Sequence, residues 1–128
     1  MAEAKIIKGY RLEPFAQCAG ALLDHARLNG ANLYSIDLRA ASLREAKLAG
    51  AHLAEARLVG VDLSGADLSG ANLSGADLSR ANLSNADLSG ANLRRTVLAG
   101  ARMSGTLLVG ARFCKTVMPD LRSNDQHC

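Results

Sequence analysis

Aromatic residues are scarce in this sequence of 128 residues, which has two tyrosines, two phenylalanines and no tryptophan. So few large rings are too little for the core of an ordinary globular domain. Long apolar runs are also missing, and none approaches the roughly 20 residues of a membrane span. The first eight residues lack the apolar stretch of a secretory signal. The sequence therefore predicts a single domain, no membrane association and a cytoplasmic location.

Cysteine is also sparse and does not form a metal-binding pattern. The three cysteines, Cys18, Cys114 and Cys128, lack the short paired spacings of a zinc site. We expect Cys18 to be a small core residue, Cys114 to point outward and Cys128 to lie in the C-terminal tail. A reactive thiol at Cys114 is the alternative, although no activating partner stands near it in the sequence. No metal or other cofactor is expected.

What the chain has instead is a strict period of five. Leucine stands at every fifth position from Leu23 to Leu98, and the residue two places before it is small, alanine in most cases. On a helix, leucines five apart would spiral around the axis, because each residue advances about 100°. In a flat strand they would alternate between the two faces. A chain that turns a corner every five residues keeps them all inside.

Four such corners close a square coil, so every twentieth residue lies in one column. The leucine and the small residue of each unit point inward, and the other three residues point outward. Coils of this kind stack through backbone hydrogen bonds about 4.8 Å apart. Each coil then contacts mainly its two neighbours, as in other solenoids.

The corners carry a turn signal. Glycine often stands two places after the leucine, where a type II turn needs a positive φ. One corner column is glycine throughout: Gly30, Gly50, Gly70, Gly90 and Gly110. Another is mixed: Ser35, Glu55, Gly75, Arg95 and Lys115. We predict type II turns along the glycine column and mixed turn types along the others.

Phrases such as Ala66-Asp67-Leu68-Ser69-Gly70, repeated without spacers, resemble those of the pentapeptide repeat family. The resemblance covers about residues 16–118. It implies an all-β fold, a right-handed quadrilateral β-helix of about five coils of twenty residues. Residues 1–15 would form an N-terminal tail and cap, and residues 119–128 a C-terminal tail.

The two ends depart from the repeat, as the caps of a solenoid must. Tyr10 and Phe15 are predicted to cover the open N-terminal end of the core. Pro14 and Pro119 lack a backbone donor and therefore suit exposed edges. Residues 121–128 are mostly polar, and we expect them to be frayed.

The outward positions between residues 61 and 93 are mostly Asp or Asn followed by Ser, which indicates a solvated surface. Towards the C-terminus this pattern ends. By the period of twenty, one face collects four basic residues: Arg94, Arg95, Arg112 and Lys115. Such a cluster would suit an acidic partner or a phosphate, and a solubilising patch is the alternative.

Outward apolar residues occur at the same end. Val97 and Val117 stack on one face, and Leu107 and Val109 lie on the opposite face. Exposed apolar clusters often mark partner sites. A homodimer through the C-terminal end is therefore one hypothesis, and a cap stiffened by its own tail is the other. Together with the four basic residues they form the candidate partner-binding surface.

No catalytic arrangement emerges from the columns. The aspartates of the middle coils are spread over three faces and do not pair for acid–base chemistry. His25 and His52 point outward on different faces, and His127 lies in the tail. We therefore predict no catalytic residue and no enzyme activity.

Two functions remain. The first is a non-catalytic, rigid protein-interaction scaffold. The second, implied by the resemblance, is a DNA-mimicking regulator or inhibitor of DNA gyrase, as in quinolone-resistance members of the family. That role needs a strongly negative surface, whereas this chain has a formal net charge of +3 and a pI near 9.0. Specific nucleic-acid binding is not expected, because aromatics are not interleaved with the basic residues. The scaffold is the preferred function.

Overall fold

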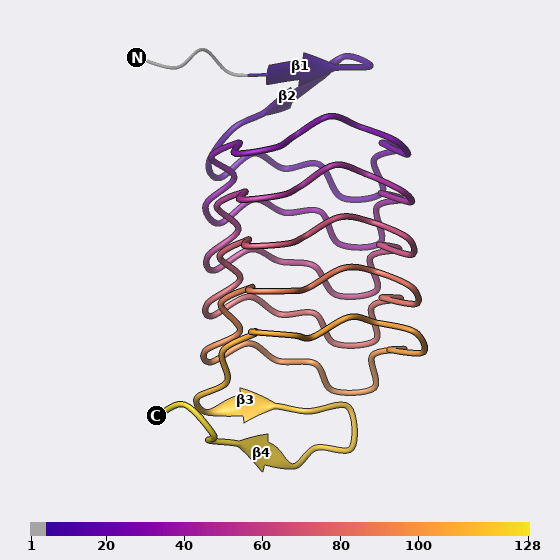
Figure 1. Ribbon diagram of the computed structural model, residues 1–128. Coiled ribbons are helices and arrows are strands. Elements are labelled where there is room, and N and C mark those ends of the chain that lie inside the picture. Colours follow the sequence, from indigo (N-terminus) through magenta and orange to yellow (C-terminus); the bar gives the residue numbers. More distant parts are fainter. Residues whose placement is uncertain (1–4) are drawn as a thin grey trace.

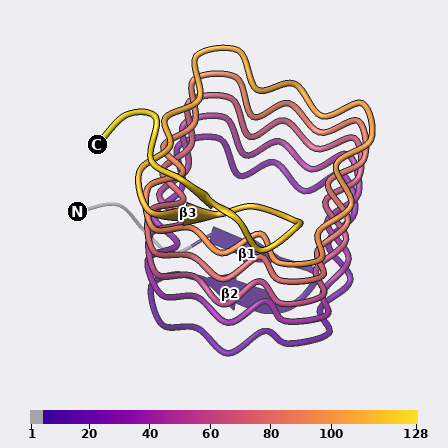
Figure 2. The ribbon, with the colours of Figure 1, turned by 90° about the horizontal axis from the view of Figure 1, so that it is seen from below.

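The computed structural model describes residues 5–128 as a stack of coils (Figure 1). Parallel backbone bridges join residues twenty apart, beginning with Gln17 and Asp37 and ending with Val97 and Val117. The bridges fall into four columns, and the coils have a four-sided outline when viewed along the stack (Figure 2). The fold is therefore a β-helix with the predicted twenty-residue period.

We number the four faces by the column of bridged residues that each carries. Face 1 carries Gln17, Asp37, Arg57, Asp77, Val97 and Val117. Face 2 carries Leu22, Ser42, Asp62, Asn82 and Arg102. Face 3 carries Arg27, Lys47, Asp67, Asp87 and Leu107. Face 4 carries Asn32, His52, Asn72, Asn92 and Arg112.

Most units are held to the next coil by three backbone hydrogen bonds, two along the face and one at the corner, where for example the His25 N–H donates to the Arg44 carbonyl at 2.8 Å. On face 2, the Leu23 N–H donates to the Ser42 carbonyl at 2.7 Å. The Ser42 N–H donates in turn to the Ala21 carbonyl at 2.9 Å. This ladder satisfies the backbone of nearly every unit, which explains why side chains at the surface are free to vary.

All corners share one geometry, so the prediction of mixed turn types is wrong. At the glycine corner, the Ala71 N–H donates to the Leu68 carbonyl, and Gly70 has a φ of 66°. At a corner without glycine, the Ala26 N–H donates to Leu23 in the same way, and His25 has a φ of 64°. The stacked coils on either side impose the turn, and the non-glycine residues accept the strained φ.

The core is a column of leucines and small residues, as predicted. The leucines from Leu23 to Leu98 are fully or almost fully buried, and Cys18 is also buried. Three inward positions carry threonine in place of alanine, Thr96, Thr106 and Thr116, and the first and last of these are fully buried. Thr96 donates its hydroxyl to the Leu73 carbonyl at 2.8 Å, and Thr116 donates to the Leu93 carbonyl, so neither buried hydroxyl is left unpaired.

A hairpin closes the N-terminal end. Strand β1 (Lys5–Ile7) pairs antiparallel with β2 (Tyr10–Leu12), with Ile6 opposite Arg11. Leu12 is buried, and Tyr10 packs against the core as predicted. The prediction for Phe15 is wrong, because its side chain is 68% exposed and contacts the Tyr34 ring edge-on. Residues 1–4 of the predicted N-terminal segment lie outside the described residues.

The C-terminal tail is ordered, which corrects the prediction that it frays. Strand β3 (Thr116–Val117) pairs antiparallel with β4 (Ser123–Asn124), with Val117 opposite Ser123. The chain then returns to the last coil, where a disulfide joins Cys114 to Cys128. A polar composition had indicated a loose end, but pairing with β3 and the disulfide hold it in place.

Hydrogen bonds between His127 and Phe113 add to the disulfide in holding the C-terminal tail against the last coil. The His127 N–H donates to the Phe113 carbonyl at 2.7 Å, and the Phe113 N–H donates to His127 Nδ1 at 2.9 Å. The two rings also stack, with centroids 6.0 Å apart. Viewed along the axis, the tail extends over only part of the end coil (Figure 2). Met103 and Leu108 of that coil remain half-buried.

No helix among residues 5–128 is long and apolar enough to cross a bilayer.

Candidate partner-binding surface

The eight candidate residues lie on three parts of the C-terminal end. The basic four gather on face 4 and on its corner with face 1, as the period predicts, because Arg112 stacks below Asn92. Val97 and Val117 stack on face 1. Leu107 stands on face 3, with Val109 following it at the next corner. The structure thus brings the basic residues and the valines to adjoining faces and leaves the other apolar pair on a separate side.

The four basic residues, Arg94, Arg95, Arg112 and Lys115, form what we call the basic cluster. Arg94 is half-buried and the other three are exposed. None of the four has an ion-pair partner among residues 5–128. The nearest tail carboxylate, Asp125, accepts the Lys115 backbone N–H at 2.8 Å. The cluster therefore keeps its charge available to a partner.

Two other arginines of the rod are paired with carboxylates, whereas Arg27, Arg57, Arg80 and Arg102 have no ion pair within residues 5–128. Arg39 donates to Asp37 from Nη2 at 2.7 Å and from Nε at 2.9 Å. Arg44 lies within 4 Å of carboxylates of both Asp24 and Asp62. These pairs are part of the rod's own surface, in contrast to the basic cluster.

The four apolar residues of the candidate partner-binding surface differ in how far their side chains are exposed to solvent. Val97 and Val117 are half-buried, and Val117 is paired with Ser123 in the β3–β4 hairpin. Leu107 and Val109 are 54% and 80% exposed. Of the two predicted apolar pairs, only the pair at face 3 presents a large accessible surface.

Face 4 also differs from the other faces in its charge. Its column from Asn32 to Arg112 holds no carboxylate, whereas the columns of the other three faces each hold at least one aspartate. These are Asp37 and Asp77 on face 1, Asp62 on face 2, and Asp67 and Asp87 on face 3. Sequence reasoning had noted the Asp/Asn alternation without sorting it by face. Reading every twentieth residue for charge would have found it.

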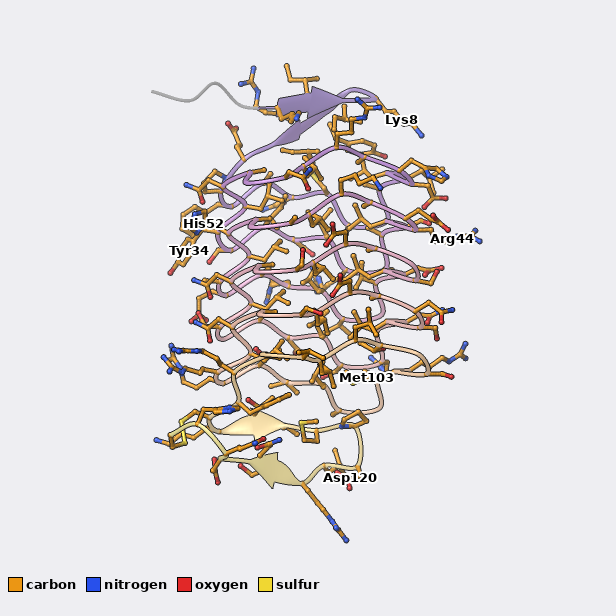
Figure 3. All side chains as sticks on the ribbon, viewed as in Figure 1. Lys8, Tyr34, Arg44, His52, Met103 and Asp120 are labelled. Atoms are coloured by element: carbon orange, nitrogen blue, oxygen red, sulfur yellow. A yellow bond between two sulfur atoms is a disulfide. The ribbon has the colours of Figure 1, made fainter. Side chains whose placement is uncertain are left out.

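A shallow pocket opens on the same face near the N-terminal end. It has a volume of about 400 Å³ and is lined by Pro14, Asn32, Tyr34, His52, Ala54 and Asn72. Tyr34 and His52 lie on one side of the stack (Figure 3). The lining of the pocket combines the apolar Pro14 and Ala54 with polar side chains, and Ala54 stands one coil beyond Tyr34 in the same column. The period of twenty predicts this stacking but not the hollow, which depends on how the side chains pack.

Three aspartates of the rod have lowered pKa values, and hydrogen bonds within the rod are the main cause. The hydrogen bond from the Arg39 side chain holds the pKa of Asp37 below its usual value, and the Ser42 hydroxyl does the same for the pKa of Asp24. The hydrogen bond from Ser89 lowers the pKa of Asp87. Burial raises the pKa of the Cys18 thiol, which disfavours the reactive thiolate. In the described part of the chain, no three His, Cys, Asp or Glu side chains gather to hold a metal.

The fold and this surface define a class, the solenoid of five-residue repeats with a continuous leucine core. The chain belongs to the pentapeptide repeat family, whose family model, "Pentapeptide repeats", matches residues 16–53, 36–75 and 76–113 with eight copies. A comparison with curated proteins gave no match.

Solved structures of the family are similar to this one. A trypsin-treated QnrB1, a plasmid-mediated fluoroquinolone resistance protein, is 28% identical, with a TM-score of 0.67 over 79% of this chain and 55% of that protein. A pentapeptide repeat protein from the Arabidopsis thaliana thylakoid lumen is 31% identical, with a TM-score of 0.59 over 91% of this chain and 72% of that protein. This chain therefore spans about half the length of QnrB1.

Proposed function

We propose that the protein is a non-catalytic, rigid scaffold that binds a protein partner through the C-terminal part of the rod. The observation that carries this proposal is the basic cluster, whose four side chains have no ion pair among residues 5–128. An uncompensated cluster on a rigid surface attracts and orients an acidic partner. The disulfide between Cys114 and Cys128 holds the backbone beside the cluster in one shape.

The test compares charge reversal inside and outside the cluster. Partners cross-linked to the tagged protein in its native cells are identified for the wild type, for Arg95→Glu/Arg112→Glu and for Arg27→Glu. Arg27 is also exposed and unpaired, but it lies on face 3. We expect the double variant to lose a partner that Arg27→Glu retains. If both variants keep every partner, the C-terminal surface is not the binding site.

A regulator of DNA gyrase is the second candidate, and the similarity to QnrB1 favours it. The net charge of +3 opposes it, because a protein that imitates DNA needs negative charge. The two functions are separated by a supercoiling assay with purified gyrase and a quinolone. Inhibition, or protection from the drug, at micromolar protein would replace the scaffold by this function.

A homodimer through the C-terminal end stays a prediction. The exposed Leu107 and Val109 support it better than Val97 and Val117, which are half-buried. Light scattering at high concentration measures the oligomeric state, and a strict monomer would exclude the dimer.

The right-handed sense of the coil and a total of about five coils are likewise proposed from the family resemblance.

The cytoplasmic location also stays a prediction, and the Cys114–Cys128 disulfide argues for an oxidising compartment instead. Alkylation of free thiols under denaturing conditions, immediately after acid quenching of the cells, distinguishes the two locations by mass. Three labelled cysteines would indicate a reducing compartment, and one labelled cysteine, the buried Cys18, would indicate an oxidising one.

A further inference from the structure

In the column of face 4 the side chains that make the Asp/Asn turn are all asparagines, whereas the columns of faces 1, 2 and 3 each include at least one aspartate that presents a carboxylate. Asp and Asn make this turn equally well. In this turn, the side-chain Oδ1 accepts the backbone N–H two residues later, as Asp67 does from Ser69 and Asn72 does from Ser74, both at 3.0 Å. With Oδ1 engaged, an aspartate turns its second, negative oxygen to the surroundings. An asparagine turns its NH₂ group there.

On face 4 this turn is made by Asn72 and, one coil further, by Asn92, whose Oδ1 accepts the Arg94 N–H at 3.1 Å. Because a backbone N–H is the donor, the acceptor must be the amide oxygen, and this fixes the orientation of the amide. Neither NH₂ group has a partner within residues 5–128. Two stacked donors therefore run along a strip that lacks carboxylates.

The strip has different chemistry at its two ends. The pocket lined by Tyr34 and Ala54 lies at one end. The basic cluster lies at the other end, three to four coils beyond Tyr34 and two to three coils beyond Ala54. At about 4.8 Å per coil, three coils span roughly 14 Å, which an extended chain covers in about four residues.

We propose that face 4 is a docking strip for an extended acidic segment of a partner protein. An apolar side chain of the segment sits in the pocket, its backbone carbonyls accept from the amides of Asn72 and Asn92, and acidic side chains about four residues further on pair with the basic cluster. This proposal rests on the proposed function, because it assumes a protein partner, and it extends the site along the whole of face 4.

Charge distribution favours a peptide over a nucleic acid. The unpaired positive charges are gathered at one end of the strip, whereas the phosphates of a nucleic acid are evenly spaced. The aromatic pair Phe15–Tyr34 lies at the opposite end from the cluster. Single-strand binding surfaces instead interleave aromatic and basic side chains along the strand. Two carboxylates border the strip: Glu55 lies at its corner with face 1, and Asp125 of the tail accepts the Lys115 backbone N–H at 2.8 Å.

The probe is a fluorescent peptide of twelve residues with one leucine, a four-residue Gly/Ser spacer and three consecutive glutamates. Its binding to the full chain is followed by fluorescence anisotropy. We expect saturable binding that weakens with salt, and about tenfold weaker binding when the glutamates are replaced by glutamines or the spacer is deleted. No binding, or equal binding of the three peptides, would overturn the proposal. So would tighter binding of a single-stranded oligonucleotide of the same charge.

The decisive variant is Asn72→Asp/Asn92→Asp, which keeps the turn because aspartate makes it elsewhere in the rod. The matched control is Asn82→Asp/Asn85→Asp, which adds the same two charges on face 2 and its corner with face 3; the Asn82 Oδ1 accepts the Ser84 N–H in the same way. We expect the face 4 variant to bind the peptide at least about tenfold more weakly and the control to match the wild type. Equal weakening in both would mean that net charge alone acts, and the strip would be refuted. If the peptide series fails while Arg95→Glu/Arg112→Glu still loses a cellular partner, the scaffold stands without this docking mode.

Discussion

The middle of the rod, residues 61–93, and its C-terminal end, residues 94–128, use the same five-residue unit but are stabilised differently. In the middle, every leucine lies between two complete coils and is fully buried. At the end, Met103 and Leu108 are half-buried, and the tail covers only part of the last coil. A coil in the middle is stabilised by the coils on both sides of it. The last coil has only one such neighbour, and a hairpin and a disulfide stabilise it instead.

The largest difference between the two regions concerns the disulfide. Replacing Cys128 by serine opens a link that spans 14 residues, and chain entropy gives such a link about 3 kcal/mol. We expect hydrogen exchange to speed up at the amides of Phe113, Lys115 and His127 and to stay unchanged in the middle coils. Reduced wild-type protein is the control and should behave alike. Faster exchange throughout the rod would show that the two regions unfold as one unit.

Overpacking tests the same comparison in the core. Ala76 is fully buried in the middle, and Ala76→Leu should lower the free energy of unfolding by roughly 1–3 kcal/mol. Ala101 stands above the half-open end beside Met103, and Ala101→Leu should cost less because the added side chain can move outward. Urea denaturation of both variants measures the difference. Equal losses would mean that the end coil is as tightly enclosed as the middle.

Inward threonines occur only towards the C-terminal end of the repeat, and two of the three share one column. Ala56 and Ala76 are followed in that column by Thr96 and Thr116. Thr116→Val removes the hydroxyl that donates to the Leu93 carbonyl, and we expect a loss of about 1 kcal/mol in unfolding free energy. Thr116→Ser keeps the donor and should lose less. A valine variant as stable as the wild type would show that the hydrogen bond contributes nothing.

The smallest effect belongs to the middle coils and depends on pH. The Asp87 pKa is lowered by the hydrogen bonds from Ser89, so the folded protein holds this carboxylate ionised to lower pH than the unfolded chain does. Its stabilisation is present above the ordinary aspartate pKa of about 4 and is lost as the pH falls through the lower folded value. Asp87→Asn should therefore make stability less sensitive to acid, measured as denaturation midpoints at neutral and acidic pH. An unchanged acid sensitivity would contradict this assignment.

Much of the architecture could be predicted from the sequence. The period of five placed the leucines inside, and the period of twenty placed the basic cluster on one face, as the bridge between Asn92 and Arg112 confirms. Turn types were predicted less well. His25 and Ala40 adopt a positive φ that their own preferences oppose, because the coils above and below leave the backbone no other path.

The tail was predicted wrongly for a different reason. Residues 121–128 are polar, and no local signal announces that β4 returns to β3 or that Cys128 reaches Cys114. For Val117 the sequence left two hypotheses open, a partner contact and a cap stiffened by the tail, and the pairing of Val117 with Ser123 favours the cap. These contacts are not periodic, so the repeat carries no information about them.

By itself, the sequence determined the coil, its core and the face on which each residue of the rod lies, because one short period repeats over most of the chain and each residue meets the one twenty places away. Only the tertiary structure decided how the rod ends and what face 4 offers. The disulfide between Cys114 and Cys128 forms only when the tail folds back onto the last coil. The pocket lies where the large Tyr34 and the small Ala54 occupy neighbouring coils. Both features depend on which side chains meet across coils. The period fixes the positions of these residues, but it does not fix their identity or their packing.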